Sequence, residues 1–279
     1  MMRPLAILED AKLAKTHTIF TDIDDTLTTD GRLPAKAYEA LERLDGAGLA
    51  VVPITGRPAG WCDMIARFWP VRGVVGENGA FYFSYDRHGR RMAQRFFASK
   101  DERLANRSKL DELRRKILSE VPGAGVASDQ TYREADLAID VCEDVPPLSR
   151  ADIERVLAIF AQAGAKAKLS SIHVNGWFGS YDKLSMTRLF AADVLGFNLD
   201  DERARAVFVG DSPNDAPMFA FFPQSCGVAN IADFALDRIS LPAYVAQHRG
   251  ADGFVEIADR LLAAKGAGLR DCGSVGGPA

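Results

Sequence analysis

Residues 18–31, Thr-Ile-Phe-Thr-Asp-Ile-Asp-Asp-Thr-Leu-Thr-Thr-Asp-Gly, constrain the fold of this chain more than any other stretch. They begin as a short run of β-branched and aromatic residues, which is typical of a buried strand. They end in aspartates, threonines and a glycine, which are typical of the loop after a strand. In an open α/β sheet, ligands bind at this carboxyl end of a strand. The sequence therefore predicts an α/β fold with a functional loop after this strand.

Three carboxylates, those of Asp22, Asp24 and Asp25, lie close together in this loop. Like charges so near one another are unfavourable unless they are solvated, protonated or neutralised by a cation. Mg²⁺, a hard divalent ion that prefers oxygen ligands, suits such a group. The alternative interpretation is a solvated acidic turn, and three later stretches of the chain argue against it.

The composition is that of a folded protein: 279 residues, of which 47% are hydrophobic and 26% charged. The formal net charge of −4 provides no basic surface, so we expect no nucleic-acid partner. No apolar run approaches the roughly 18 residues that suggest a membrane span, and residues 1–15 lack the apolar core of a signal peptide. The four cysteines are scattered without Cys-x-x-Cys spacing, so we expect reduced thiols and a cytoplasmic protein that does not bind membranes.

Short apolar runs alternate with helical patterns in the first part of the chain. Apolar runs at 18–21 and 49–54 flank a helical pattern at 35–47. This order predicts a βαβ unit whose two strands are parallel neighbours.

From about residue 85 to residue 178 the pattern is that of a small α+β module, with a long charged helix, an alternating strand, a second helix and a strand pair. The βα rhythm returns after residue 179, and its last helix is expected to end near residue 264. We therefore expect a core of residues 1–84 and 179–264, an inserted domain of residues 85–178, and a glycine-rich, disordered tail of residues 265–279.

Thr55-Gly-Arg57 follows the second apolar run. A hydroxyl and backbone N–H groups at the end of a parallel strand can bind an anion. Thr55 can also be the N-cap of a helix, because Pro58 suits a first helical turn. The two interpretations are compatible.

Gly210-Asp-Ser-Pro-Asn-Asp215 follows another apolar run and is typical of a loop at a strand end. Lys183 begins the helix that precedes this run. Lys166 and Lys168 are the competing candidates for a cationic residue near the loops, and we favour Lys183 because of its place at a helix start.

With these four stretches the sequence resembles the haloacid dehalogenase superfamily of phosphohydrolases. Asp22-Ile-Asp-Asp-Thr-Leu27 matches the first motif, Asp-x-Asp-x-Thr-Leu, and the Thr55, Lys183 and Gly210 stretches match the second, third and fourth. The insert resembles the α/β cap (type C2, IIB) of Cof-like, sucrose-phosphate and mannosyl-3-phosphoglycerate phosphatases, as does Gly76-Glu-Asn-Gly-Ala80. The resemblance implies a Rossmann-like parallel-sheet core with an inserted α+β cap. One departure is Asp25, where many members carry glycine; we expect it to be tolerated.

The resemblance implies a Mg²⁺-dependent phosphatase, a phosphoric monoester hydrolase that acts on a small phosphorylated metabolite, most naturally a sugar phosphate. By the family pattern, Asp22 attacks phosphorus to form an aspartyl-phosphate, and Asp24 protonates the leaving oxygen and then activates water. Mg²⁺ would be held by Asp22, Asp211 and the main-chain carbonyl of Asp24.

The remaining motif residues would surround the phosphoryl group. Thr55, Gly56 and Lys183 would hold its oxygens, where charge must be stabilised in the transition state. Asn214 would contact the phosphate site, and with Asp215, in a supporting role, it would orient the lysine and the waters on the metal.

Three polar residues of the insert, Arg133, His173 and Asn175, are candidates to contact the leaving group of the substrate. They lie before or on predicted strands that lead back to the core. The alternative interpretation is that they are ordinary surface or hairpin residues.

Two other functions share parts of this pattern. A phosphotransferase or phosphomutase would pass the phosphoryl group to another sugar hydroxyl instead of water. A phospho-acceptor signalling module also pairs an acidic cluster with a threonine and a lysine. We disfavour the signalling module, because the large insert and an acid/base at Asp24 do not suit a long-lived aspartyl-phosphate.

Overall fold

The computed structural model describes residues 2–170, 172–234 and 241–272. The chain forms two compact units. The first comprises Met1–Ile54, Phe68–Gly73 and Arg188–Ala279, and the second comprises Thr55–Arg67 and Val74–Thr187. The domain boundaries expected near residues 84 and 178 do not coincide with the limits of these units, and they stay a prediction.

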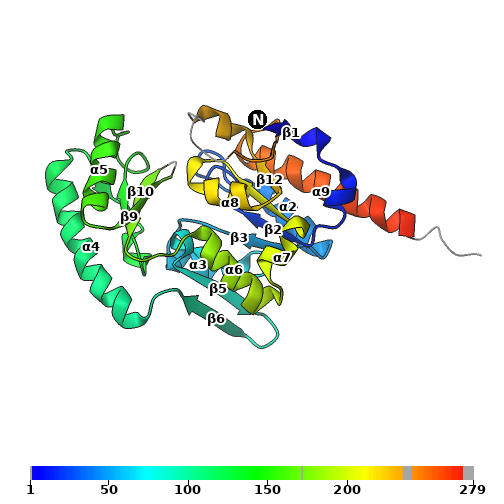
Figure 1. The fold of residues 1–279 in the computed structure, drawn as a ribbon, viewed down its shortest axis with the longest axis horizontal. Helices are drawn as coiled ribbons and strands as arrows, with labels where there is room; N and C mark the ends of the chain where they lie inside the picture. Colours follow the sequence, from blue (N-terminus) through cyan, green and yellow to red (C-terminus); the bar gives the residue numbers. More distant parts are fainter. Residues whose placement is uncertain (1, 171, 235–240, 273–279) are drawn as a thin grey trace, which may run out of the picture. The chain divides into compact units, whose positions relative to one another are not determined.

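A parallel six-stranded sheet forms the centre of the first unit (Figure 1). Its strands, in spatial order, are β1 (Arg3–Pro4), β13 (Tyr244–Val245), β12 (Gln224–Gly227), β11 (Ala206–Gly210), β2 (Thr18–Thr21) and β3 (Ala50–Pro53). Thr21 is in register with Val209 on one side and with Pro53 on the other. The prediction that the strands at 18–21 and 49–54 are parallel neighbours is confirmed.

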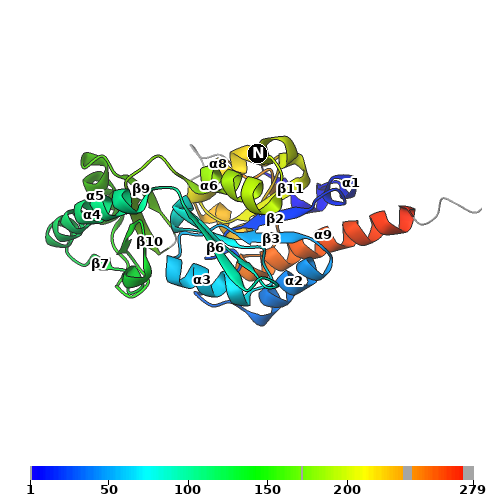
Figure 2. The same ribbon diagram turned by 90° about the horizontal axis from the view of Figure 1, so that it is seen from below.

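The helices of the first unit are α1 (Asp10–Leu13), α2 (Ala35–Gly46), α7 (Leu199–Glu202), α8 (Ala216–Phe221) and α9 (Gly250–Cys272). α2 connects β2 to β3, and α8 connects β11 to β12 in the opposite direction along the sheet. Since such crossovers are right-handed, the two helices lie on opposite faces (Figure 2). The strand order therefore reverses between β2 and β11, which makes a topological switch point.

Short helical turns complete the first unit. They are Leu5–Ile7, Ala191–Leu195, Arg203–Arg205, Pro213–Asp215 and Ala229–Asp233.

The last helix is longer than the sequence suggested. α9 continues to Cys272, so residues 265–272 of the expected tail are helical. An alanine, a lysine, a leucine and an arginine in this stretch favour a helix, whereas its two glycines do not. Residues 273–279 of that expected tail lie outside the described residues. None of the helices in the described part of the chain is long and apolar enough to cross a membrane.

The second unit contains two antiparallel sheets. β4 (Val74–Gly76), β5 (Phe81–Asp86) and β6 (Arg91–Phe96) form one, in that order. The other has the order β7 (Gly125–Val126), β8 (Leu137–Asp140), β10 (His173–Trp177), β9 (Lys166–Leu169). The helices are α3 (Ala59–Phe68), α4 (Lys100–Glu120), α5 (Arg150–Gln162) and α6 (Lys183–Phe190), with short turns at Glu77–Gly79 and Gln130–Tyr132.

Helices α4 and α5 pack together on one face of the four-stranded sheet (Figure 1). Ile117 and Phe160, one from each helix, are fully buried against Ile139 and Val174 of the sheet. A Cβ on Gly176 would lie 2.1 Å from the Phe160 ring, so a glycine is needed where this ring meets β10. The predicted α/β class, with a parallel sheet and an inserted α+β module, is confirmed.

Candidate active site

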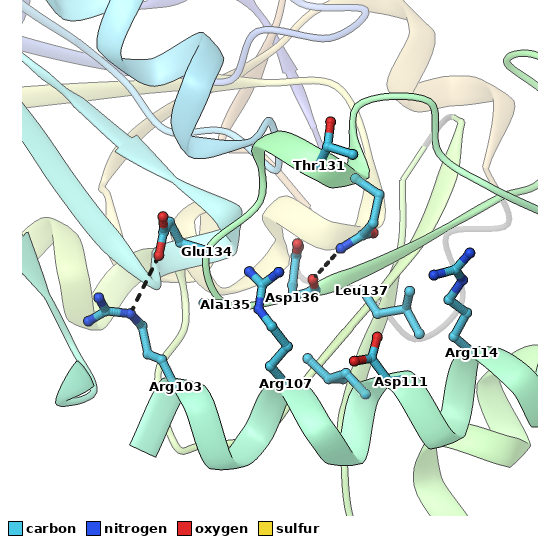
Figure 3. Close-up of a pocket in the computed structure, with 11 residues that line it drawn as sticks. Arg103, Arg107, Asp111, Arg114, Thr131, Glu134, Ala135, Asp136 and Leu137 are labelled. Carbon is cyan, nitrogen blue, oxygen red and sulfur yellow. Dashed lines mark hydrogen bonds and ion pairs between the residues drawn. The ribbon is translucent and has the colours of Figure 1, made fainter. Parts of the chain in front are cut away.

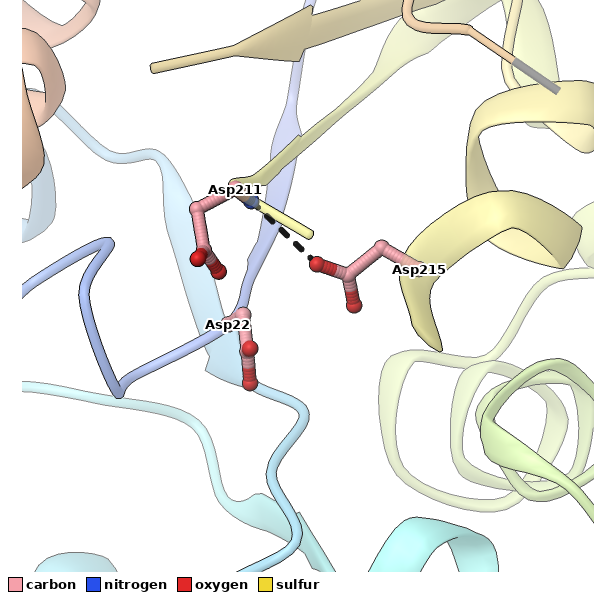
Figure 4. A group of neighbouring side chains, drawn as sticks. All are labelled: Asp22, Asp211 and Asp215. Atoms are coloured by element: carbon pink, nitrogen blue, oxygen red, sulfur yellow. Dashed lines mark hydrogen bonds between the residues drawn. The ribbon is translucent and has the colours of Figure 1, made fainter. Parts of the chain in front are cut away.

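Asp22 and Asp211 directly follow the two strands at the switch point, β2 and β11. The two strand ends are joined because the Asp22 amide donates to the Val209 carbonyl at 2.9 Å. Asp215 ends the short helix Pro213–Asp215 after β11. One carboxylate oxygen from each of the three aspartates lies within 4.8 Å of the other two (Figure 4). All three side chains are buried.

Local contacts hold this group of carboxylates in place. The Asp211 amide donates to Asp215 Oδ2 at 3.3 Å, and Thr26 Oγ1 donates to Asp211 Oδ1 at 3.2 Å. A Cβ on Gly210 would lie 2.4 Å from Asp215 Oδ2. The glycine of the fourth motif is therefore required for the close approach of the Asp215 carboxylate to the end of β11.

The three carboxylates fit a divalent cation. Buried like charges at this separation need a neutralising partner, and carboxylate oxygens are the ligands that Mg²⁺ prefers. The structure brings Asp22 and Asp211 together as the sequence predicted, and it adds Asp215, which we had expected only in a supporting role. The spacing of four residues between Asp211 and Asp215 across a single turn was the available signal. The main-chain carbonyl of Asp24 as a metal ligand stays a prediction.

Asp24 and Asp25, in the same loop, are half-buried. Asp25 has a φ of 55°, in the left-handed region, and its carbonyl accepts a hydrogen bond from Asn230 Nδ2 at 2.6 Å. Aspartate is among the residues that tolerate this conformation, which explains why it can stand where related sequences have glycine. Asn230 follows β12 and was not predicted from the sequence. Asn214 accepts from Ser212 Oγ at 2.8 Å, and its role toward phosphate stays a prediction.

Thr55 begins the second unit, two residues after β3 ends. Its amide donates to the Val75 carbonyl at 2.9 Å, and its carbonyl accepts from the Asn78 amide at 3.0 Å. Its Oγ1 accepts from the Arg57 amide at 3.0 Å. The Thr55-Gly56 backbone is thus bound to the turn that follows β4. A Cβ on Gly56 would lie 3.2 Å from Asn78 Nδ2, so little space remains beside it.

Lys183 lies beside the same turn. Gly79, with a φ of +105°, passes so close to the start of α6 that a Cβ would lie 2.0 Å from the Asp182 carbonyl oxygen. Lys183 is the first residue of α6 and is 4% exposed, whereas Lys166 and Lys168 are exposed. Burial of a cation at a helix start beside the Thr55 segment supports the choice of Lys183. That all four motifs form one site stays a prediction.

The Arg133 guanidinium is bound within the second unit. The side chain is fully buried. Nε and Nη2 donate to the Asp129 carboxylate at 2.9 and 3.1 Å, and Nη1 donates to the Gly56 carbonyl at 2.9 Å and to Asp136 at 3.0 Å. Asn175 Nδ2 donates to Asp136 at 3.0 Å in the same network. Arg133 and Asn175 are thus both bound in a buried polar network, and a direct contact of either with the substrate stays a prediction.

Glu77 completes this network and was not predicted from the sequence. Its buried carboxylate accepts backbone hydrogen bonds from Ala59, Glu134, Ala135 and Asp136, at 2.6–3.2 Å. Burial, followed by the nearby charge of Asp136, raises the pKa of Glu77 to about 8. The glutamate of Gly76-Glu-Asn-Gly-Ala80 is thus a structural residue that ties the turn to residues 134–136.

His173 is also paired within the second unit. Its Nε2 lies 2.9 Å from Glu143 Oε2, and Arg57 Nη2 donates to Glu143 Oε1 at 3.1 Å. The contact with His173 and the charge of Arg57 lower the pKa of Glu143 to about 2, against the opposing effect of burial. The Glu143 side chain is 31% exposed, which leaves it more accessible than His173. A contact of His173 with the substrate stays a prediction, and Glu143 is a further residue that sequence reasoning missed.

Comparisons with known proteins agree with this geometry. A family model described as haloacid dehalogenase-like hydrolase matches residues 19–109. No curated protein matches the chain.

Solved structures match over most of both chains. The structure of Thermoplasma acidophilum 0175 has a TM-score of 0.68 at 19% identity, over 88% of this chain and 98% of that one. A trehalose-6-phosphate phosphatase related protein has a TM-score of 0.59 at 16% identity, over 91% and 99%. The sucrose-phosphatase of Synechocystis sp. PCC6803, in complex with sucrose and phosphate, has a TM-score of 0.57 at 15% identity, over 88% and 97%.

A doubly wound α/β fold with buried carboxylates at its switch point defines the class of this protein as an α/β enzyme with an acidic site. The family match spans about a third of the chain and includes both the Asp22 loop and the Thr55 stretch. Over these residues the chain is similar to haloacid dehalogenase-like hydrolases, in agreement with the resemblance of its motifs.

Proposed function

We propose that this hydrolase is a Mg²⁺-dependent phosphatase for a small phosphomonoester, of the sugar phosphate class, and that it is cytoplasmic. The observation that carries the proposal is the group of buried carboxylates of Asp22, Asp211 and Asp215 at the switch point. The sugar phosphate class is supported by the likeness in fold to a sucrose-phosphatase bound to sucrose and phosphate. The location is supported by free thiols at Cys62 and Cys226.

The chemistry follows from the residue types. Mg²⁺, when bound by Asp22, Asp211 and Asp215, would screen the negative charges of the nucleophile and the phosphate from each other. An Asp22 oxygen attacks phosphorus, the bond from phosphorus to the leaving oxygen breaks, and Asp24 gives that oxygen its proton. Water then attacks the phosphorus of the aspartyl-phosphate and gives a proton to Asp24, the bond from phosphorus to the Asp22 oxygen breaks, and inorganic phosphate is released. Thr55 and Lys183 hold the phosphoryl oxygens.

The test is release of inorganic phosphate from a panel of phosphorylated metabolites and p-nitrophenyl phosphate, with and without Mg²⁺. Asp22→Asn should abolish turnover, because a neutral amide of the same shape replaces the nucleophile. Asp24→Asn should lower kcat by about 10²–10⁴ through loss of acid–base catalysis, with Mg²⁺ affinity largely kept. Substantial activity in pure Asp22→Asn protein would contradict the proposal. Transfer of phosphate to a sugar instead of water would indicate a phosphotransferase.

A further inference from the structure

The Gly56–Arg57 peptide in the second unit is held at both ends. Its N–H, on Arg57, donates to Thr55 Oγ1 at 3.0 Å, and its carbonyl, on Gly56, accepts from Arg133 Nη1 at 2.9 Å. The bond from Arg57 uses a lone pair of the Thr55 hydroxyl and leaves its proton to be donated elsewhere. The orientation of this one peptide therefore determines where the Thr55 hydroxyl proton can point.

Arg133 is itself firmly placed. Asp129 and Asp136 accept its other hydrogen bonds, and Glu77 binds the backbone of residues 134–136 that follow it. On the other side of this segment, α4 forms a pocket of about 170 Å³ with residues 130–137 (Figure 3). Arg107, which lines the pocket, donates to the Arg133 carbonyl at 2.6 Å. The guanidinium that binds the Gly56 carbonyl is thus itself held in place by hydrogen bonds.

We infer that Arg133 is a positioning residue for the phosphate-binding segment Thr55–Gly56. Its hydrogen bond to the Gly56 carbonyl links that segment to residues 129–136. The inference rests on the proposed function, in which Thr55 binds the phosphoryl group. A buried ion pair with bidentate geometry suits such a role, because its donors are fixed in a plane. Loss of the guanidinium would free the Gly56 carbonyl, and the peptide could rotate away from the orientation that phosphate needs.

This role differs in its consequences from contact with the leaving group. A residue that contacts the leaving group changes kcat/KM unequally from one substrate to another. A residue that orients the phosphate-binding segment acts on the part that all substrates share. Its removal should therefore lower kcat/KM by the same factor for every substrate. Its removal should also weaken the binding of inorganic phosphate.

The experiment compares Arg133→Met and Arg133→Lys with the wild type, and uses Arg114→Ala as the control. Arg114 is an exposed arginine of α4 that lines the same pocket. Each protein is assayed on p-nitrophenyl phosphate and on several sugar phosphates, and competitive inhibition by inorganic phosphate gives a phosphate affinity. The Mg²⁺ concentration for half-maximal activity is measured in parallel, and circular dichroism checks the fold.

For Arg133→Met we expect kcat/KM to fall by about 10²-fold on every substrate, because a small displacement of a binding group has an effect of this size. The phosphate affinity should fall in the same variant, with half-activation by Mg²⁺ unchanged. Arg133→Lys, which keeps the charge but has fewer donors, should lie between it and the wild type. Should Arg133→Met not fold, Arg133→Lys decides by the same criteria.

A folded Arg133 variant with unchanged phosphate affinity would overturn the inference, and so would a loss confined to some substrates. The proposed function is tested separately by wild-type phosphate release and by Asp22→Asn. If the wild type released phosphate and Asp22→Asn did not, a normal Arg133 variant would refute the positioning role alone.

Discussion

At the scale of single residues, Asp25 occupies a backbone conformation that glycine adopts more easily. Its φ of 55° lies in the left-handed region, which costs L-residues about 1–2 kcal/mol and aspartate somewhat less. Asp25→Gly should therefore increase the free energy of unfolding by up to about 1 kcal/mol, partly offset by the greater entropy of an unfolded glycine. Urea denaturation followed by circular dichroism measures the change.

Asp30 provides the control for this prediction, because it has a φ of 50° and an exposed side chain. Asp30→Gly should give a similar gain in stability. If Asp30→Gly were stabilising while Asp25→Gly were clearly destabilising, the Asp25 carboxylate would have a structural role that outweighs its backbone strain.

At the scale of elements, Gly79 allows the turn after β4 to lie directly against the start of α6. Gly79→Ala would place a Cβ 2.0 Å from the Asp182 carbonyl oxygen and would displace the helix that begins with Lys183. We expect a loss of about 2–4 kcal/mol in the free energy of unfolding, from overpacking and from the positive φ together. Phosphatase activity should fall at least about tenfold in the folded fraction, because Lys183 moves.

The variant Gly164→Ala separates the effect of overpacking from the effect of the positive φ. Gly164 also has a positive φ, +74°, but nothing lies within 4 Å of its Cβ position. This variant should lose only about 1–2 kcal/mol, the backbone cost, with activity unchanged. If Gly79→Ala and Gly164→Ala lost equal stability and equal activity, the contact between the turn and α6 would contribute to neither.

At the scale of the whole molecule, the buried carboxylates at the switch point couple the stability of the fold to its metal. Mg²⁺ at concentrations well above its dissociation constant should raise the free energy of unfolding by about 1–3 kcal/mol, since binding to the native state alone is stabilising. Thermal unfolding with Mg²⁺ and with EDTA measures this as a shift in Tm.

Asp215→Asn should reduce the increase in Tm that Mg²⁺ causes, because the cation loses one of its three proposed carboxylate ligands. A wild-type Mg²⁺ shift in Asp215→Asn would show that Asp215 is not a ligand and would restore the supporting role expected from the sequence.

Sequence periodicity was sufficient to predict two neighbouring strands of the parallel sheet. Short apolar runs separated by helical patterns predicted β2 and β3 as neighbours, because strand and helix periodicities are local properties of the chain. The loops after β2 and β11 were predicted for the same reason, since polar residues that directly follow buried strands must lie at the sheet edge. The extent of α9 was missed, because the two glycines near its end suggested a tail and helix ends are weakly encoded.

The sequence by itself determined the neighbouring strands β2 and β3, the α/β class and the aspartates at the strand ends, because each depends on neighbours a few positions away. Only the tertiary structure decided the partners of the polar residues. Arg57 and Glu143 are 86 positions apart, and Glu77 and Glu134 are 57 apart, so no local pattern links them. From the sequence, Arg133 was either a candidate for contact with the leaving group or an ordinary surface residue. Its burial, with carboxylates on both sides and the Gly56 carbonyl in reach, depends on how distant segments pack.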